Sequence, residues 1–124
     1  MVKPTPGYWC ECWTGGTDGT APTRFAAFDA HSAGQAVRWI AIALNTITSA
    51  LDDNSAAHAW QWLYEGRHAM AEALCQGKPC NVSFTTQRTR ITWTARPVHF
   101  LPLAHRQAAR LPACTDQFSP SAGQ

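Results

Sequence analysis

Four of the five cysteines fall into two close pairs, which raises the question of a zinc site. Cys10 and Cys12 are separated by one residue, and Cys75 and Cys80 by four. Thiolates are common ligands of structural zinc, which holds them at tetrahedral positions. On a regular strand, however, residues two apart lie about 6.6 Å from each other and project in parallel, too wide for one tetrahedral ion unless the backbone bends. We therefore expect ordinary thiols, and neither a metal nor a cofactor.

A second candidate for chemistry is a group of titratable side chains in a predicted helix. His68 and Glu72 stand four residues apart, and Glu65 lies three residues before His68. Helical side chains at these spacings share a face and can share a proton or a metal ion. Since no second histidine pair accompanies them, a solvated helix face is the better interpretation.

Other catalytic patterns are equally weak. Asp29 and His31 lie close to Ser32 in the sequence, but the fold, and not neighbouring position, brings the members of a catalytic triad together. Gly15 and Gly16 lead into a loop and not into a helix, so they do not form a phosphate-binding loop. These observations predict a protein that is not an enzyme.

A row of arginine and threonine residues is the main indication of nucleic-acid binding. Arg88, Arg90, Thr92 and Thr94 alternate along the last predicted strand, so they share one face of it. Such a row could bind phosphates, and the affinity would then fall steeply as salt rises. Aromatic residues for base stacking are missing from this strand face, so recognition of single strands is poorly supported and a solvated sheet surface is the alternative.

Charge is distributed unevenly along the chain. The formal net charge is +2, but residues 1–75 carry four basic and seven acidic side chains, whereas residues 76–124 carry six basic and one acidic. The C-terminal third is therefore a modestly basic surface.

Length and composition place the chain among single-domain proteins. A chain of 124 residues can bury a core without disulfides or a metal. The start lacks the apolar region of a signal peptide, and the longest strongly apolar stretch, Trp39 to Leu44, is too short to cross a bilayer. We expect a cytoplasmic protein with no membrane association, in which the cysteines are free thiols.

Strand and helix signals follow the order ββααββ. Strands are predicted at Tyr8–Thr14, Thr23–Phe28, Asn81–Thr86 and Arg88–Ala95, where aromatic and β-branched residues are frequent between turn residues. Two helices are predicted between them, from Ala33 to about Leu51 after a capping box at Ser32 and Gln35, and from Ser55 to Cys75.

This order predicts an α+β fold with one antiparallel sheet of about four strands and two antiparallel helices on one face. Residues 1–111 would form the single domain. Residues 112–124, rich in Ser, Pro, Gly and Gln, are predicted to be a disordered tail. The strand order is not readable from the sequence.

The first helix is apolar on two sides. Its core-facing stripe has apolar residues three and four apart, at Val37, Ile40, Leu44, Ile47 and Leu51. Ile42 lies about 180° from the centre of this stripe and Trp39 about 120° from it, at about 100° per residue. These two side chains are left over for a contact outside the core.

The second predicted helix also has apolar side chains on two sides, and two of them are tryptophans. At about 100° per residue, Trp60 and Trp62 point in nearly opposite directions, so only one of them can enter the core. We expect a core face at Ala57, Trp60, Leu63, Tyr64, Ala71 and Leu74, and an outer face at His58, Trp62, Glu65, Ala69 and Glu72. Trp62 beside acidic residues resembles a binding anchor with a charged rim.

Two further positions in this helix need an explanation. Arg67 falls on the predicted core face, where a guanidinium requires a carboxylate or several carbonyls, and Glu11 is one conceivable partner. Gly66, in the middle of the helix, costs about 1 kcal/mol relative to Ala, so it would permit a close approach or a kink.

The excess of tryptophan, the residue most enriched at binding hot spots, predicts a non-catalytic protein that docks stoichiometrically onto another macromolecule. The predicted contact residues are Trp39, Ile42, His58, Trp62 and Glu65, and the partner would be a protein, such as one in a host nucleic-acid-handling complex. In size and in the lack of catalytic motifs, the chain resembles the small inhibitors that phages and mobile elements make against host defences, anti-CRISPR proteins included. No motif carries that resemblance.

Three alternatives to a protein-docking surface stay open. The first is nucleic-acid binding through Arg88 and Arg90. The second is a homodimer formed through the outer face of the first helix. In the third, the chain after Pro97 folds over the outer helix positions and leaves no docking surface.

Overall fold

The computed structural model describes residues 3–101 and confirms the predicted α+β fold, with four antiparallel strands and helices in the order ββααββ. The elements are β1 (Thr5–Gly16), β2 (Thr23–Ala30), α1 (Ala33–Ile47), the 3₁₀ turn η1 (Thr48–Ala50), α2 (Asp53–Gln61), the π turn η2 (Trp62–Gly66), α3 (Arg67–Cys75), β3 (Cys80–Thr85) and β4 (Thr89–Phe100). The second predicted helix is thus the continuous run α2, η2 and α3.

By contacts the chain divides into two compact units, Pro6–Val98 and the terminal segments Met1–Thr5 with His99–Gln124. The surfaces discussed below belong to Pro6–Val98. The predicted domain end at Leu111, the predicted tail from Pro112, and most of the segment proposed to fold over the helices lie outside the described residues.

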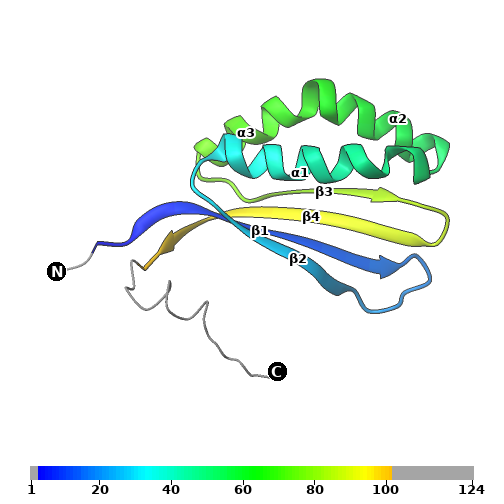
Figure 1. Ribbon diagram of the computed structural model, residues 1–124, viewed down its shortest axis with the longest axis horizontal. Coiled ribbons are helices and arrows are strands. Elements are labelled where there is room, and N and C mark those ends of the chain that lie inside the picture. The colour runs from blue at the N-terminus through cyan, green and yellow to red at the C-terminus, as the bar shows by residue number, and fades with distance from the viewer. Residues whose placement is uncertain (1–2, 102–124) are drawn as a thin grey trace. The chain divides into compact units, whose positions relative to one another are not determined.

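The strand order is β2-β1-β4-β3, so the two hairpins meet through β1 and β4, which become the central strands (Figure 1). Within the first hairpin, Cys10 lies opposite Phe28 and Cys12 opposite Ala26. The register then shifts, because Trp13 lies opposite Arg24, which leaves Phe25 as an extra residue in a β-bulge. This bulge changes the direction of Phe25 relative to its neighbours.

All the helices of residues 3–101 lie on one side of the sheet (Figure 1). In this layer α1 packs against β2 and α3, while α2 and α3 pack against β3. The core between helices and sheet is centred on fully buried Cys10, Ile40, Leu44, Leu74 and Phe84. We call the opposite side of the sheet the outer sheet face. In the described part of the chain, no helix combines the length and the apolar character needed to cross a membrane.

The start of α1 follows the predicted capping box, whereas α1 ends at Ile47, before the predicted Leu51, and α2 begins at Asp53, before the predicted Ser55. The Ser32 hydroxyl accepts a hydrogen bond from the Gln35 backbone N–H at 3.0 Å, and the Gln35 side chain accepts one from the His31 N–H at 2.6 Å. Together these bonds satisfy donors at the start of α1. At the end of α3, Gly77 has a φ of +85°, the left-handed conformation that closes a helix at low cost only with glycine.

The inward face of the second helical run is only partly the predicted one: Leu74 is buried, and Leu63 and Ala71 pack against the core, but the tryptophan that points inward is a different one. Trp62 is buried with 7% of its surface exposed, whereas Trp60 is 43% and Tyr64 74% exposed. The π turn explains the difference: it holds more residues per turn than an α turn, so Ala59 before it and Trp62 at its start align with Met70 and Leu74 after it.

Gly66 closes the π turn and makes room for the inward tryptophan. A Cβ atom at this position would lie 2.9 Å from Cδ1 of Trp62, closer than side chains normally approach. The close approach predicted for Gly66 is therefore real, and the group that approaches is the Trp62 indole.

Candidate binding surfaces

The five predicted contact residues are distributed over three surfaces. Trp62 is buried, so the prediction that it is an exposed anchor is wrong. Trp39 is half-buried, and its ring stacks on Phe28 with centroids 5.5 Å apart and an interplanar angle of 12°. Ile42 is 57% exposed on α1, and His58 and Glu65 are exposed on α2 and η2. The structure thus keeps Ile42, His58 and Glu65 at the surface.

His58, Trp62 and Glu65 do lie together, around a shallow hollow of about 340 Å³. Trp62 contributes a small exposed part to its lining, and the His58 ring contacts Phe84 edge-on at 5.5 Å between centroids. The predicted rim is present, but the aromatic group that should stand inside it is part of the core.

The exposed apolar residues instead meet in a groove between α1 and the second helical run. Trp60 and Tyr64, four residues apart at the junction of α2 and the π turn, stack with centroids 6.1 Å apart, and Ile42 lines the same depression from α1. We call this depression of about 540 Å³ the helix groove; it is lined by Arg38, Ala41, Ile42, Asn45, Trp60, Leu63, Tyr64 and Arg67. Sequence reasoning missed Trp60 and Tyr64 as surface residues because it placed both in the core.

The helix groove has two cationic walls. Arg38 lies on the α1 side and Arg67 at the start of α3, and within residues 3–101 neither guanidinium forms an ion pair with a carboxylate. Arg67 is half-buried and lines the groove, and Glu11, one conceivable partner for it from the sequence, pairs with Arg24 instead. The aromatic groove is therefore electrostatically suited to an anionic group.

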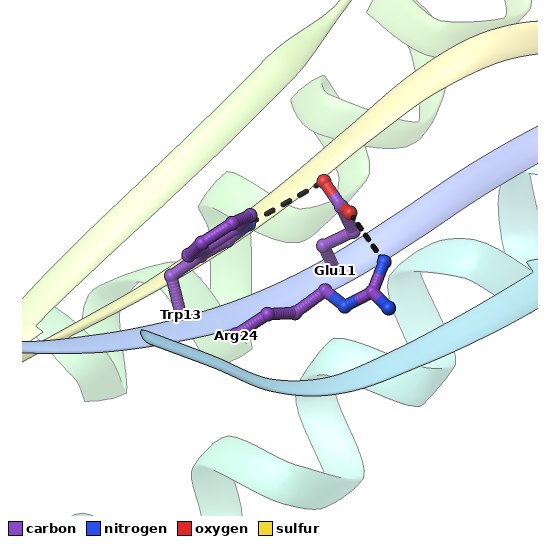
Figure 2. Close-up of polar contacts among 3 residues, drawn as sticks. All are labelled: Glu11, Trp13 and Arg24. Atoms are coloured by element: carbon purple, nitrogen blue, oxygen red, sulfur yellow. Dashed lines mark hydrogen bonds and ion pairs between the residues drawn. The ribbon is translucent and has the colours of Figure 1, made fainter. Parts of the chain in front are cut away.

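A different cluster occupies the outer sheet face. Because Cys10 and Cys12 point into the core, Trp9, Glu11 and Trp13 alternate onto the other side. Figure 2 shows the Glu11 carboxylate between two donors, the Trp13 indole N–H at 3.4 Å and the Arg24 guanidinium at 3.2 Å.

The Glu11 carboxylate is stabilised in its charged form. Partial burial raises its pKa, but hydrogen bonds from Trp9, Arg24 and Trp13 and the charge of Arg24 together lower the pKa below its usual value. The Trp13 indole and the Arg24 guanidinium, which lie on paired strands of the hairpin, are thereby held by one carboxylate.

The arginine and threonine row of β4 lies beside these indoles. Arg90, Thr92 and Thr94 line a hollow of about 330 Å³ together with Trp13, because β1 and β4 are neighbours in the sheet. The row on β4 itself has no aromatic residue, but the neighbouring strand β1 brings Trp13 beside it. Arg88 precedes β4, which begins at Thr89; its backbone carbonyl accepts a hydrogen bond from the Thr17 N–H at 3.0 Å.

The described thiols differ in environment. Cys10 and Cys12 are buried in the core, Cys80 is half-buried and Cys75 is exposed. Burial, reinforced by the negative charge of Asp29, raises the pKa of Cys10 to about 11, and burial raises the pKa of Cys12 and of Cys80. Among residues 3–101, no three His, Cys, Asp or Glu side chains form a group that could hold a metal ion.

Comparison with known proteins found no relative of this chain. The chain matches no model of a protein family, no curated protein and no solved structure.

Proposed function

We propose that this chain is a non-catalytic binding protein that docks onto another protein through the helix groove. The observation that carries the proposal is the gathering of Ile42, Trp60 and Tyr64, all more than two-fifths exposed, around one depression. Large apolar side chains exposed together usually mark a contact surface on a protein. Trp, Tyr and Arg are also the residue types that dominate binding energies at interfaces.

The groove favours an apolar segment with acidic flanks as its occupant. Ile42 and Leu63 offer aliphatic surface, which packs against apolar side chains and cannot stack on nucleic-acid bases as aromatic rings do. Arg38 and Arg67, unpaired with carboxylates within the described residues, would face the acidic groups. Charges on the wall of a groove orient a partner and accelerate its association.

Photo-crosslinking tests this proposal in cells that express the chain naturally. A benzophenone amino acid replaces Tyr64 in the groove, and in a matched second protein it replaces Thr92 on the outer sheet face. We expect one discrete adduct from position 64 and none from position 92. With the captured protein purified, a 1:1 complex should form, and Trp60→Ala or Tyr64→Ala should weaken it by about thirtyfold, the effect of a hot-spot residue.

Charge reversal and solution mass complete the design. Arg38→Glu with Arg67→Glu should slow association, and the wild-type rate should fall with added salt. An adduct with twice the mass of the chain, together with a mass in solution that rises with concentration, would identify a homodimer and contradict a foreign partner. Adducts of equal intensity at positions 64 and 92, or affinities unchanged by both alanine substitutions, would also contradict the proposal.

A second candidate function is the binding of single-stranded nucleic acid on the outer sheet face. The observation in its favour is the hollow in which Trp13 joins Arg90, Thr92 and Thr94. Aromatic rings that stack on bases, beside cations that contact phosphates, are the usual components of single-strand binding surfaces. The carboxylate of Glu11 between the indoles weakens this candidate, since it repels phosphates.

A labelled dT20 oligonucleotide tests this candidate. Binding at low salt should weaken steeply as salt rises, and Trp13→Ala and Arg90→Ala should each reduce it, whereas Tyr64→Ala should not. Absence of binding between the wild-type protein and the oligonucleotide at low salt would contradict this candidate function.

A further inference from the structure

The two walls of the helix groove carry the same spacing of residues. On α1 the lining residues are Arg38, Ala41, Ile42 and Asn45, and on the second helical run they are Trp60, Leu63, Tyr64 and Arg67. In each set the later members lie three, four and seven residues after the first one, which places them in one stripe along a helix. The groove is therefore a channel between two helical stripes, on helices of one layer (Figure 1).

One end of this channel is cationic and the remainder is largely apolar. A short connection, residues 48–52, joins the end of α1 to the start of α2, and α1 packs against α3, so the two helices run in opposite directions. Arg38 and Arg67 therefore lie at the same end of the groove, with Ile42 and Tyr64 in its middle. Among the described residues that line the groove, none is acidic. An occupant with carboxylates at one end would match this distribution of charge.

The walls also restrict the conformation of the occupant. Both are helices, in which the backbone N–H and C=O groups bond to each other. An extended segment buried between them would remove its own backbone groups from water and find few backbone partners, whereas an α-helix satisfies these groups internally. Side-chain ridges of a third helix, three or four residues apart, would also fit between the two stripes. The groove therefore favours a helix.

We propose that the occupant of the helix groove is an amphipathic α-helix of a partner protein, with acidic side chains at the end that lies between Arg38 and Arg67. Its apolar side chains, three and four residues apart, pack on Ile42, Trp60 and Tyr64, which is the usual way in which a helix binds a groove. This inference rests on the proposed function and specifies the segment that docks. Two copies of the chain facing each other through this groove would bring no carboxylate to it, so charge favours a foreign helix.

Three synthetic peptides of about 14 residues, or about four helical turns, test the proposal. The first is held helical by a hydrocarbon staple, carries leucines three and four residues apart on one face, and has two aspartates in its last turn. The second has two asparagines in place of the aspartates. The third lacks the staple and has two central prolines, which prevent a helix. By fluorescence anisotropy we expect the wild-type protein to bind the first peptide in the micromolar range, and each of the others about tenfold more weakly.

Variants of the chain locate the contact. Tyr64→Ala should weaken binding of the first peptide about tenfold, and Thr92→Ala on the outer sheet face should leave it unchanged. Arg38→Gln with Arg67→Gln removes the charges and keeps long polar side chains, so it should abolish the preference for aspartate over asparagine. All four positions are exposed or half-buried, so the variants should remain folded, which thermal unfolding checks.

The outcomes separate this inference from the proposed function. If crosslinking at position 64 captures a partner but the first peptide fails to bind, or binds no more tightly than the third, a helical occupant is excluded while docking through the groove still stands. Equal affinities of the first and second peptides for the wild type would overturn the assignment of the acidic end. Absence of both a captured partner and peptide binding would overturn both proposals, as would a homodimer closed through the groove.

Discussion

Single side chains determine how the thiols of this protein react. Cys75 is exposed, Cys80 is half-buried with a raised pKa, and Cys10 and Cys12 are in the core. Because the thiolate is the reactive form, we expect Cys75 to react first with Ellman's reagent at pH 8, Cys80 more slowly, and the other two only as the protein unfolds. The measurement uses a Cys114→Ser background, and adding Cys75→Ser should remove the fast phase. A fast phase that survives this change would contradict the assignment.

Cys10 also predicts an alkaline limit to stability. Its pKa is raised from 9.0 to about 11 in the fold, so the unfolded thiol ionises first as the pH rises. The unfolded state is therefore favoured increasingly between pH 9 and pH 11, and stability that is constant below this window falls within it. Urea denaturation at a series of pH values should show this fall, and Cys10→Ala, although less stable throughout, should show a smaller slope. Equal slopes in the two proteins would exclude Cys10 as the cause.

At the same scale, the sequence predicts strand faces better than helix faces. A strand alternates strictly, so the separation of Cys10 and Cys12 from Trp9 and Trp13 could be read directly. Assigning Trp60 to the core assumed the same rotation per residue along the whole helix. The π turn at Trp62–Gly66 changes this rotation. The error reversed the roles of the two neighbouring tryptophans.

At the scale of elements, the π turn is the feature on which the helix groove depends. In exposed helix positions, replacing Gly with Ala stabilises a protein by about 0.5–1 kcal/mol. At Gly66 the added methyl would meet Trp62 at 2.9 Å, so Gly66→Ala should destabilise the protein and red-shift its tryptophan emission as the indole moves. Gly34→Ala is the matched control, because the nearest atom to its Cβ would lie 3.9 Å away. Thermal unfolding should show opposite signs for the two variants.

The glycine alone could not have predicted this geometry. A glycine within a helix is compatible with a kink, a close approach or a π turn, and choosing among them requires the position of the Trp62 indole. The start of α1, in contrast, depends on a local signal, the Ser32 cap, and was readable.

At the scale of the whole sheet, the surfaces arise from contacts between distant segments. Trp13 and Arg90 lie far apart in sequence and meet because β1 and β4 pair at the centre. Nothing local specifies which edges of two hairpins join, so the outer sheet face with its aromatic and cationic residues could not be assembled from the sequence. A pocket between α1 and the sheet also could not be assembled from the sequence, because its lining residues come from β1, β2, β4 and α1.

The helix layer and the sheet are joined at the start of α2 by a polar network centred on Thr85 of β3. The Thr85 hydroxyl donates to the Asp52 carboxylate at 2.8 Å, and its backbone N–H donates to the Ser55 hydroxyl at 2.9 Å. The Ser55 N–H and the Thr85 hydroxyl, in that order, lower the pKa of Asp52 against a small opposing effect of burial. This charge therefore stabilises the fold above the ordinary pKa of an aspartate, and the contribution is lost as the pH falls through the lowered value.

Removing the Thr85 hydroxyl should therefore change how stability depends on pH. Thr85→Val keeps the shape of the side chain, so we expect a lower melting temperature at pH 7 and a difference from the wild type that shrinks as the pH falls through the lowered pKa of Asp52. Thr86→Val, which removes a long 3.4 Å bond within the β3–β4 turn, is the control and should lower stability by a similar amount across the same pH range. A constant deficit for Thr85→Val would mean that the hydroxyl stabilises the protein independently of the Asp52 charge.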